Sequence, residues 1–333
     1  MSDESAVLQH YLAPLQALLD PPDVTDLVIN RPGEMAIEQA GVWRWIAAPQ
    51  LTPAWLATLA TAAAAYTAQD VNAETPICST VLPQGERCQI VLPPAAEHLS
   101  LTIRRPAAVD LSLEDMTAAG LFDAVEVRTS TGSDLERDLL SRYDAGDWPS
   151  FLTLAVKAKR NILISGATGS GKTTLAKALV RLIPADERLL TIEDARELTT
   201  PHRNAVHLLY AKDGQGLAKI GAKALLESAL RMRPDRILLQ ELRDSSAFTY
   251  LRSANSGHPG SITTVHADSA VLAFEQLALL IKESDGGRDL RREEIGQLLR
   301  LLIDIVVQVR RVEGRFRVTE VWYEPLPRRA LAA

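Results

Sequence analysis

A glycine-rich run at residues 166–173 carries the clearest chemical signal in this chain. Its sequence, GATGSGKT, fits the pattern G-x-x-x-x-G-K-[ST] at every defined position. The glycines allow the backbone to wrap around a phosphate and to aim its N–H groups at the phosphate oxygens. Lys172 is placed to bridge the β- and γ-phosphates, and Thr173 is placed to bind Mg²⁺. The run therefore predicts a nucleotide-binding site.

The context of this run supports the same interpretation. The apolar residues 161–165 before it are typical of a buried strand, and residues 172–183 after it have the pattern of a helix. The N-terminal end of that helix adds positive potential where the phosphates would lie. The expected nucleotide-binding residues are Gly166, Ala167, Thr168, Gly169, Ser170, Gly171, Lys172, Thr173 and Thr174.

Acidic residues follow two apolar runs that resemble neighbouring strands. Glu193 and Asp194 end RLLTIED, and Glu241 ends RILLQE. Carboxylates at the carboxyl ends of parallel strands face the ligand crevice. We expect one of Glu193 and Glu241 to be the base that activates water, and Glu241 to join Thr173 as a Mg²⁺ ligand. Other P-loop NTPases often carry Asp before that acid, whereas this chain has Gln240.

Several cationic side chains are further candidates. His266 ends the strand-like run 261–267, where it either contacts a γ-phosphate or is a hydrogen-bonded core histidine. Arg87 and Arg104 either reach a γ-phosphate from another domain or subunit, or form surface ion pairs. For Arg105 the surface ion pair is the stronger interpretation. Four more arginines surround the run 236–241, namely Arg231, Arg233, Arg236 and Arg243.

The chain divides into two parts of different pattern. Residues 1–125 mix helical runs with alternating runs joined by turns, which predicts a small α+β domain with antiparallel strands. Residues 126–150 are polar and turn-rich, and we interpret them as a linker that holds one short helix at 135–142. In residues 151–333 strands and helices alternate, which predicts an α/β domain with a mostly parallel sheet. The strands expected there are 161–165, 188–194, 205–210, 236–241 and 261–267, with helices at 172–183 and 217–232.

Composition narrows the function classes. Apolar residues make up 47% of the chain, and it holds only two cysteines, Cys78 and Cys88, too few for a disulfide framework. The N-terminus lacks an apolar signal segment, and no apolar run could span a membrane, so we expect a cytoplasmic protein or one held at a membrane surface.

Charge is distributed unevenly along the chain. Residues 1–150 carry 8 Lys/Arg against 21 Asp/Glu, whereas residues 151–333 carry 28 Lys/Arg against 21 Asp/Glu. This difference in net charge suggests that the two halves have different partners.

Together these motifs resemble a known family. The runs GATGSGKTT, TIEDARELT, RMRPDRILLQELRD and SGHPGSITTVHA occur in the order used by bacterial secretion ("traffic") ATPases. The runs ERCQIVLPP and LSLTIRRP favour the hexameric ATPase of Vir-type type IV secretion systems. The resemblance covers roughly residues 24–325. The chain lacks the four-cysteine motif of type II relatives.

The resemblance implies a subunit of a six-membered ring, with ATP and Mg²⁺ between an N-terminal domain and a RecA-like domain. It implies that Glu193, Glu241, His266, Arg87 and Arg104 are catalytic. Hydrolysis would then drive pilus assembly and transfer of a protein or DNA substrate. It would do so together with other secretion components, at the periphery of the inner membrane and in contact with anionic lipid. The alternative is a nucleic-acid-stimulated motor of the helicase or packaging type, although no nucleic-acid-binding motif with interleaved aromatic residues is present.

Overall fold

The computed structural model describes residues 3–106, 112–125, 133–212, 215–255 and 257–325. The chain forms two compact units. Unit 1 comprises Met1–Pro93 and His98–Gly132, and unit 2 comprises Pro94–Glu97 and Ser133–Ala333. Within the described part of the chain, no helix combines the length and the hydropathy that crossing a bilayer requires.

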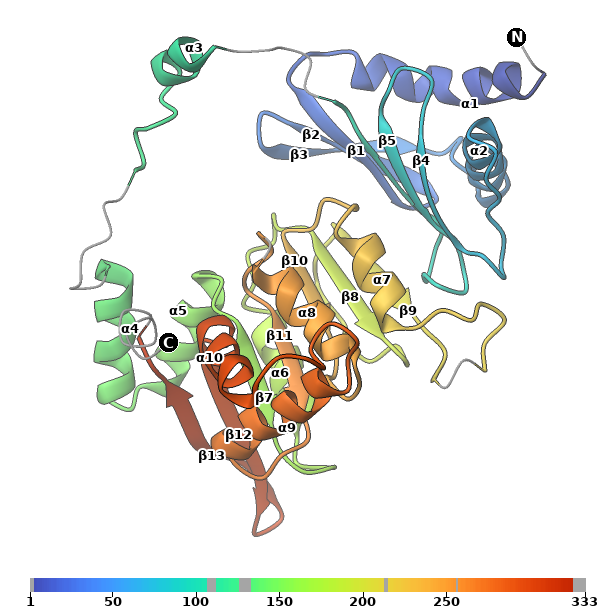
Figure 1. Cartoon of the computed structure of the whole chain (residues 1–333). Coiled ribbons are helices and arrows are strands. Elements are labelled where there is room, and N and C mark those ends of the chain that lie inside the picture. Colours follow the sequence, from blue (N-terminus) through green and yellow to red (C-terminus); the bar gives the residue numbers. More distant parts are fainter. Residues whose placement is uncertain (1–2, 107–111, 126–132, 213–214, 256, 326–333) are drawn as a thin grey trace. The chain divides into compact units, whose positions relative to one another are not determined.

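Unit 1 is built on a six-stranded sheet in the order β3-β2-β1-β6-β5-β4. Every neighbouring pair is antiparallel, as the alternating sequence pattern predicts. Helices α1 and α2 pack against this sheet through the apolar core of the unit (Figure 1). The elements are α1 (Asp3–Leu19), β1 (Val24–Arg31), β2 (Gly33–Gln39), β3 (Val42–Ala48), α2 (Pro53–Tyr66), β4 (Ile77–Val81), β5 (Arg87–Val91), β6 (Ser100–Arg104) and α3 (Leu113–Ala118).

Local sequence signals explain where these elements begin. Helix α2 starts after Thr52, whose hydroxyl accepts a hydrogen bond from the Trp55 N–H, and proline occupies its first turn. Helix α3 begins with a capping box between Ser112 and Asp115. Cys78 and Cys88 are free and buried in the β4–β5 hairpin, which confirms that they are small core residues.

Unit 2 contains a mostly parallel sheet, as predicted. Its strands form the orders β9-β8-β10 and β11-β7-β12-β13. A parallel bridge between Glu241 and Thr264 joins the two groups, so the strands follow one another as β9-β8-β10-β11-β7-β12-β13. Among the strands of the described residues, only the β12–β13 pair is antiparallel. An isolated antiparallel bridge also joins Ala96 to Leu208. The strands are β7 (Ile162–Ser165), β8 (Leu189–Glu193), β9 (Ala205–Leu209), β10 (Arg236–Leu239), β11 (Ile262–Val265), β12 (Ile305–Val312) and β13 (Arg315–Tyr323).

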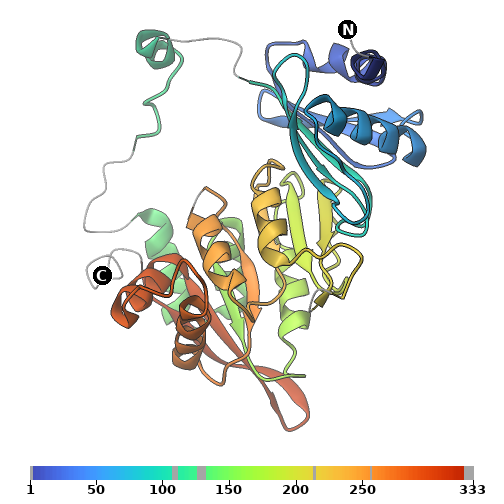
Figure 2. The same ribbon diagram turned by 45° about the vertical axis from the view of Figure 1, so that its right-hand side comes forward.

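Helices cover both faces of this sheet (Figures 1 and 2). The helices α4 (Asp134–Asp144), α5 (Trp148–Lys157) and α6 (Lys172–Val180) pack on one face. The right-handed connections between parallel strands place the remaining helices on the other face. These are α7 (Ala222–Ala229), α8 (Ser246–Asn255), α9 (Ala270–Lys282) and α10 (Arg292–Leu302). Because both faces are covered, the central strands β7, β8 and β10 are buried along their whole length.

The expected linker differs from what the structure shows. Residues 126–132 lie outside the described residues, but α4 and the first turn of α5 occupy most of the rest of 126–150. Leu139 and Phe151 are fully buried in the core of unit 2, and the Glu136 carboxylate pairs with Arg160. The short helix expected at 135–142 is confirmed as α4, but the polar, turn-rich composition of the stretch hid that its apolar positions pack into the core of unit 2. Helix α7, at Ala222–Ala229, is shorter than the helix expected at 217–232.

One arginine of the group around β10 supports the fold rather than the chemistry. The Arg236 guanidinium is fully buried and donates to both carboxylate oxygens of Glu187, at 2.7 and 2.9 Å. We expect Arg236→Met to lower the free energy of unfolding by about 3 kcal/mol, because Glu187 would keep only Lys159, at 3.5 Å. Urea denaturation of the full chain measures this. The matched Arg233→Met, which removes a partly exposed pair, should cost under about 1 kcal/mol, and equal losses would contradict the assignment.

Candidate active site

The phosphate-binding run forms the expected loop between a strand and a helix. Strand β7 ends at Ser165, and α6 begins at Lys172, directly after Gly171. Gly171 has φ +96°, a conformation that favours glycine. At Gly166 a Cβ atom would lie 2.3 Å from the carbonyl oxygen of Val309 and 2.5 Å from Oγ of Ser170. Both positions therefore exclude a side chain, and the loop keeps its backbone open for a ligand.

The Lys172 ammonium lies folded onto this loop. Its Nζ donates to the carbonyl oxygens of Gly166, at 2.8 Å, and Ala167, at 3.0 Å. Burial lowers the pKa of Lys172, and the negative charge of Glu241 opposes that shift. Beside it, the buried Ser170 Oγ has no hydrogen-bond partner within the described part of the chain. A buried donor without a partner is what an anionic ligand at this loop would satisfy.

Two more predicted residues lie next to Lys172. Nδ1 of His266 is 3.3 Å from Lys172 Nζ, and its Nε2 is 2.9 Å from Oε1 of Glu241. A neutral imidazole with its proton on Nε2 satisfies both contacts, since it accepts from the ammonium and donates to the carboxylate. Because β10, β11 and β7 are consecutive in the sheet, their carboxyl ends bring these three side chains together. His266 is therefore not a core histidine: its side chain is 47% exposed.

Glu193 has different surroundings. Its carboxylate is buried, accepts the backbone N–H groups of Glu197 and Leu198 at 3.0 and 2.7 Å, and receives the Thr191 hydroxyl at 3.2 Å. Burial raises the pKa of Glu193, and these hydrogen bonds oppose the rise. Strands β10 and β11 lie between β8 and β7. Three strand spacings, about 14 Å in total, therefore separate β8 from β7. The structure does not bring Glu193 to Lys172.

The N-terminal arginines lie side by side in unit 1. Arg87 and Arg104 are exposed and directly opposite each other in the β5–β6 register. Like charges in that position are unfavourable unless an anion lies nearby. Nε of Arg104 is 3.8 Å from the buried Asp26 carboxylate. Arg105 instead donates to backbone carbonyls at the end of α1 and just after it, those of Leu19 at 3.0 Å, Asp20 at 3.1 Å and Pro21 at 2.6 Å, so its role is structural.

The sequence did not point to every residue around the loop. Phe316, in the β12–β13 hairpin, lies against Gly171, and no motif marks it. Arg243 was singled out only as part of a group. It bonds Asp194 at 2.8 Å and the Tyr210 hydroxyl at 3.0 Å, so it braces the segments after β8, β9 and β10.

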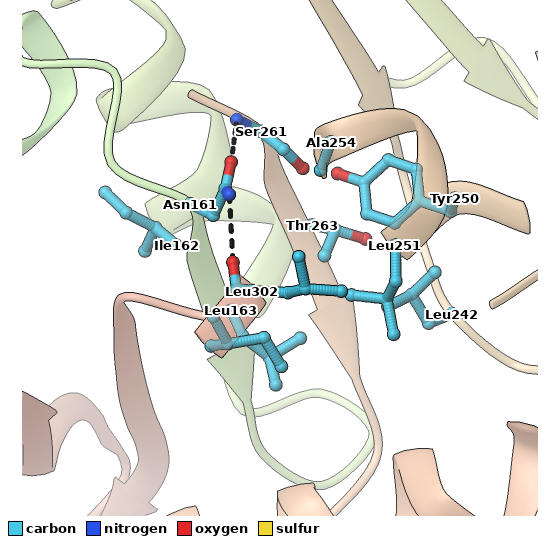
Figure 3. Close-up of a pocket in the computed structure, with 11 residues that line it drawn as sticks. Asn161, Ile162, Leu163, Leu242, Tyr250, Leu251, Ala254, Ser261, Thr263 and Leu302 are labelled. Carbon is cyan, nitrogen blue, oxygen red and sulfur yellow. Dashed lines mark hydrogen bonds between the residues drawn. The ribbon is translucent and has the colours of Figure 1, made fainter. Parts of the chain in front are cut away.

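A cavity in unit 2 lies elsewhere on the sheet (Figure 3). Tyr250 and Leu251 of α8 line it together with Thr263 of β11. Asn161, just before β7, closes one side and bonds Ser261 N and the Leu302 carbonyl oxygen. The lining is mainly apolar and buried under α8, and Asn161 marks the amino end of β7. The phosphate-binding loop leaves from the carboxyl end of that strand, so this cavity is not the nucleotide site.

These features define a P-loop nucleotide-binding domain of the mostly parallel α/β class. Residues 12–312 match the family described as "Type II/IV secretion system protein". The chain is 50% identical to the type IV secretion system protein VirB11 of Bartonella quintana, across 99% of this chain and 96% of that protein. Identity to the Brucella suis VirB11 is 45%, across 99% and 95%.

A solved structure agrees with these relatives. The crystal structure of the Brucella suis VirB11 ATPase in complex with sulphate matches with a TM-score of 0.91 and 44% identity, over 97% of this chain and 99% of that one. The chain belongs to the type II/IV secretion system protein family, within its VirB11 branch. The expected RecA-like fold and the expected ATPase of type IV secretion are thus confirmed, and the nucleic-acid motor is not favoured.

Proposed function

We propose that this chain couples ATP hydrolysis at the 166–174 loop to movements that drive pilus assembly and substrate transfer in a type IV secretion system. The observation that carries the proposal is the contact series from Lys172 through His266 to Glu241 beside a loop built for phosphates. Lys172 neutralises charge on the β- and γ-phosphates. Glu241 orients the attacking water and accepts its proton. His266 positions Glu241 and links it to the phosphate end of the site.

The residues present fit Mg²⁺. The half-buried Thr173 hydroxyl opens the first turn of α6, and Glu241 supplies a partly exposed carboxylate. Mg²⁺ is usually held by one or two protein groups together with substrate phosphates and water, so a larger protein cluster is unnecessary. The described residues contain no group of three or more acidic, histidine or cysteine ligands. The ion would withdraw charge from the phosphates, and Thr173 and Glu241 would hold it.

The assembly belongs to the same proposal. We infer a homo-hexamer in which Arg87 and Arg104 supply positive charge to the nucleotide. The exposed, directly opposed pair of guanidinium groups supports this role, because the two groups together present more positive charge than the single Asp26 carboxylate beside Arg104 balances. The inferred partners are other type IV secretion components at the inner membrane, with peripheral attachment that includes anionic lipid.

Phosphate release and solution mass together test the proposal. With ATP and Mg²⁺, we expect hydrolysis without nucleic acid and a particle of six times the 36.3 kDa chain mass. Light scattering on the sample used for the assay measures the mass. A monomer that hydrolyses ATP only after single-stranded DNA is added would contradict the proposal and restore the nucleic-acid motor.

A further inference from the structure

The two faces of the β12–β13 hairpin contact different helices. On one face Val307 and Val321 lie in the core that α5 and α6 cover. The opposite face meets α9, where Glu320 accepts the Ala270 N–H at 3.0 Å and Trp322 stacks edge-on with Phe274. Side chains alternate along each strand, so the register decides which residues near the hairpin tip share the α6 face.

Four residues near the tip lie on the α6 face. The register pairs Val309 with Val318 and Arg311 with Phe316. These four side chains lie on the same face of the hairpin as Val307 and Val321. Phe316 reaches the phosphate-binding loop: a Cβ at Gly171 would lie 2.8 Å from its Cγ. Even so, the Phe316 residue is 56% exposed and Val318 is 45% exposed. A large ring therefore lies in water beside the start of α6, without being needed to fill the core.

The sheet order sets the direction of a bound nucleotide. Lys172, His266 and Glu241 mark the γ-phosphate end, because β10 and β11 lie on one side of β7. The nucleoside end must leave the loop away from these groups. Strand β12 is the neighbour of β7 on the other side, and its hairpin carries Phe316.

We propose that Phe316 is a stacking surface for the base of the nucleotide, with the exposed Arg311 beside it on the same face. An aromatic ring next to the loop can pack against a planar base, and such stacking contributes substantially to nucleotide affinity. This inference rests on the proposed nucleotide site and adds the part that distinguishes a nucleoside triphosphate from triphosphate alone.

Equilibrium binding of ADP and of inorganic triphosphate tests the proposal on the full chain. We expect Phe316→Ala to weaken ADP binding about 5- to 100-fold and to leave triphosphate binding unchanged. Phe316→Tyr should retain ADP binding, because it keeps the ring. Val312→Ala, in the same hairpin but on the α9 face, is the matched control and should change neither affinity.

Two results would overturn the role of Phe316. In one, Phe316→Ala binds ADP as the wild type does. In the other, it loses ADP and triphosphate equally, which would mean that the ring only shapes the loop. Failure of the nucleotide site itself has a different signature: the wild-type chain would bind neither probe.

Discussion

Lys172→Ala should reduce ATP hydrolysis by about a hundredfold to a thousandfold or more. In the proposed mechanism Lys172 neutralises charge on the β- and γ-phosphates, and removing a single positioned donor to developing charge costs about that much. In the structure its ammonium already lies on the loop, held by the Gly166 and Ala167 carbonyl oxygens. Binding a nucleotide therefore exchanges these contacts for phosphate oxygens over a short distance.

The control for this change is Lys177→Ala, in the last turn of the same helix. It removes the same charge from α6 at a point away from the loop, so hydrolysis should stay within about twofold of wild type. Phosphate release measures both variants, and urea denaturation checks that both are folded. Activity of Lys172→Ala within threefold of wild type would contradict the assignment of the loop as the catalytic site.

Much of the site could be predicted because its signals are local. The spacing of glycines around Lys172 follows from the geometry of a phosphate-binding turn. The apolar run before it is typical of a strand buried on both faces of a parallel sheet, which is what β7 is. The capping box at Ser112 and the hairpin with Cys78 and Cys88 are also local patterns. Each of them could be recognised without knowledge of distant contacts.

What could not be predicted depends on the order of strands. Glu193 and Glu241 both end apolar strands, so the sequence treats them alike. The sheet separates them, because β10 is two strands from β7 and β8 is three. Phe316 is a similar case, since only the pairing of β12 with β7 brings it to Gly171. Helix α4 was predicted, at 135–142, but its place in the core of unit 2 was not, because its polar face dominates its composition and Leu139 is buried only by tertiary contacts.

The second large effect on ATP hydrolysis is expected at Glu241. Glu241→Gln should lower hydrolysis by about a hundredfold to ten-thousandfold, because glutamine cannot accept the proton of the attacking water. ADP binding should stay within a few-fold of wild type, since the loop, Lys172 and Thr173 are unchanged and the glutamine amide oxygen can still coordinate Mg²⁺. His266 remains near the new side chain, whose amide oxygen can still accept its Nε2 proton.

Glu193→Gln is the matched variant, and we expect its hydrolysis to stay within about tenfold of wild type. The glutamine oxygen can accept the Glu197 and Leu198 N–H groups, while its amide can donate to the Thr191 hydroxyl, so the turn after β8 is retained. Single-turnover phosphate release, with ADP affinity measured on the same samples, separates chemistry from binding. If Glu193→Gln lost hydrolysis and Glu241→Gln kept it, the base would be Glu193. The segment after β8 would then have to move toward the loop when ATP binds, which the hydrogen bonds that now hold its carboxylate oppose.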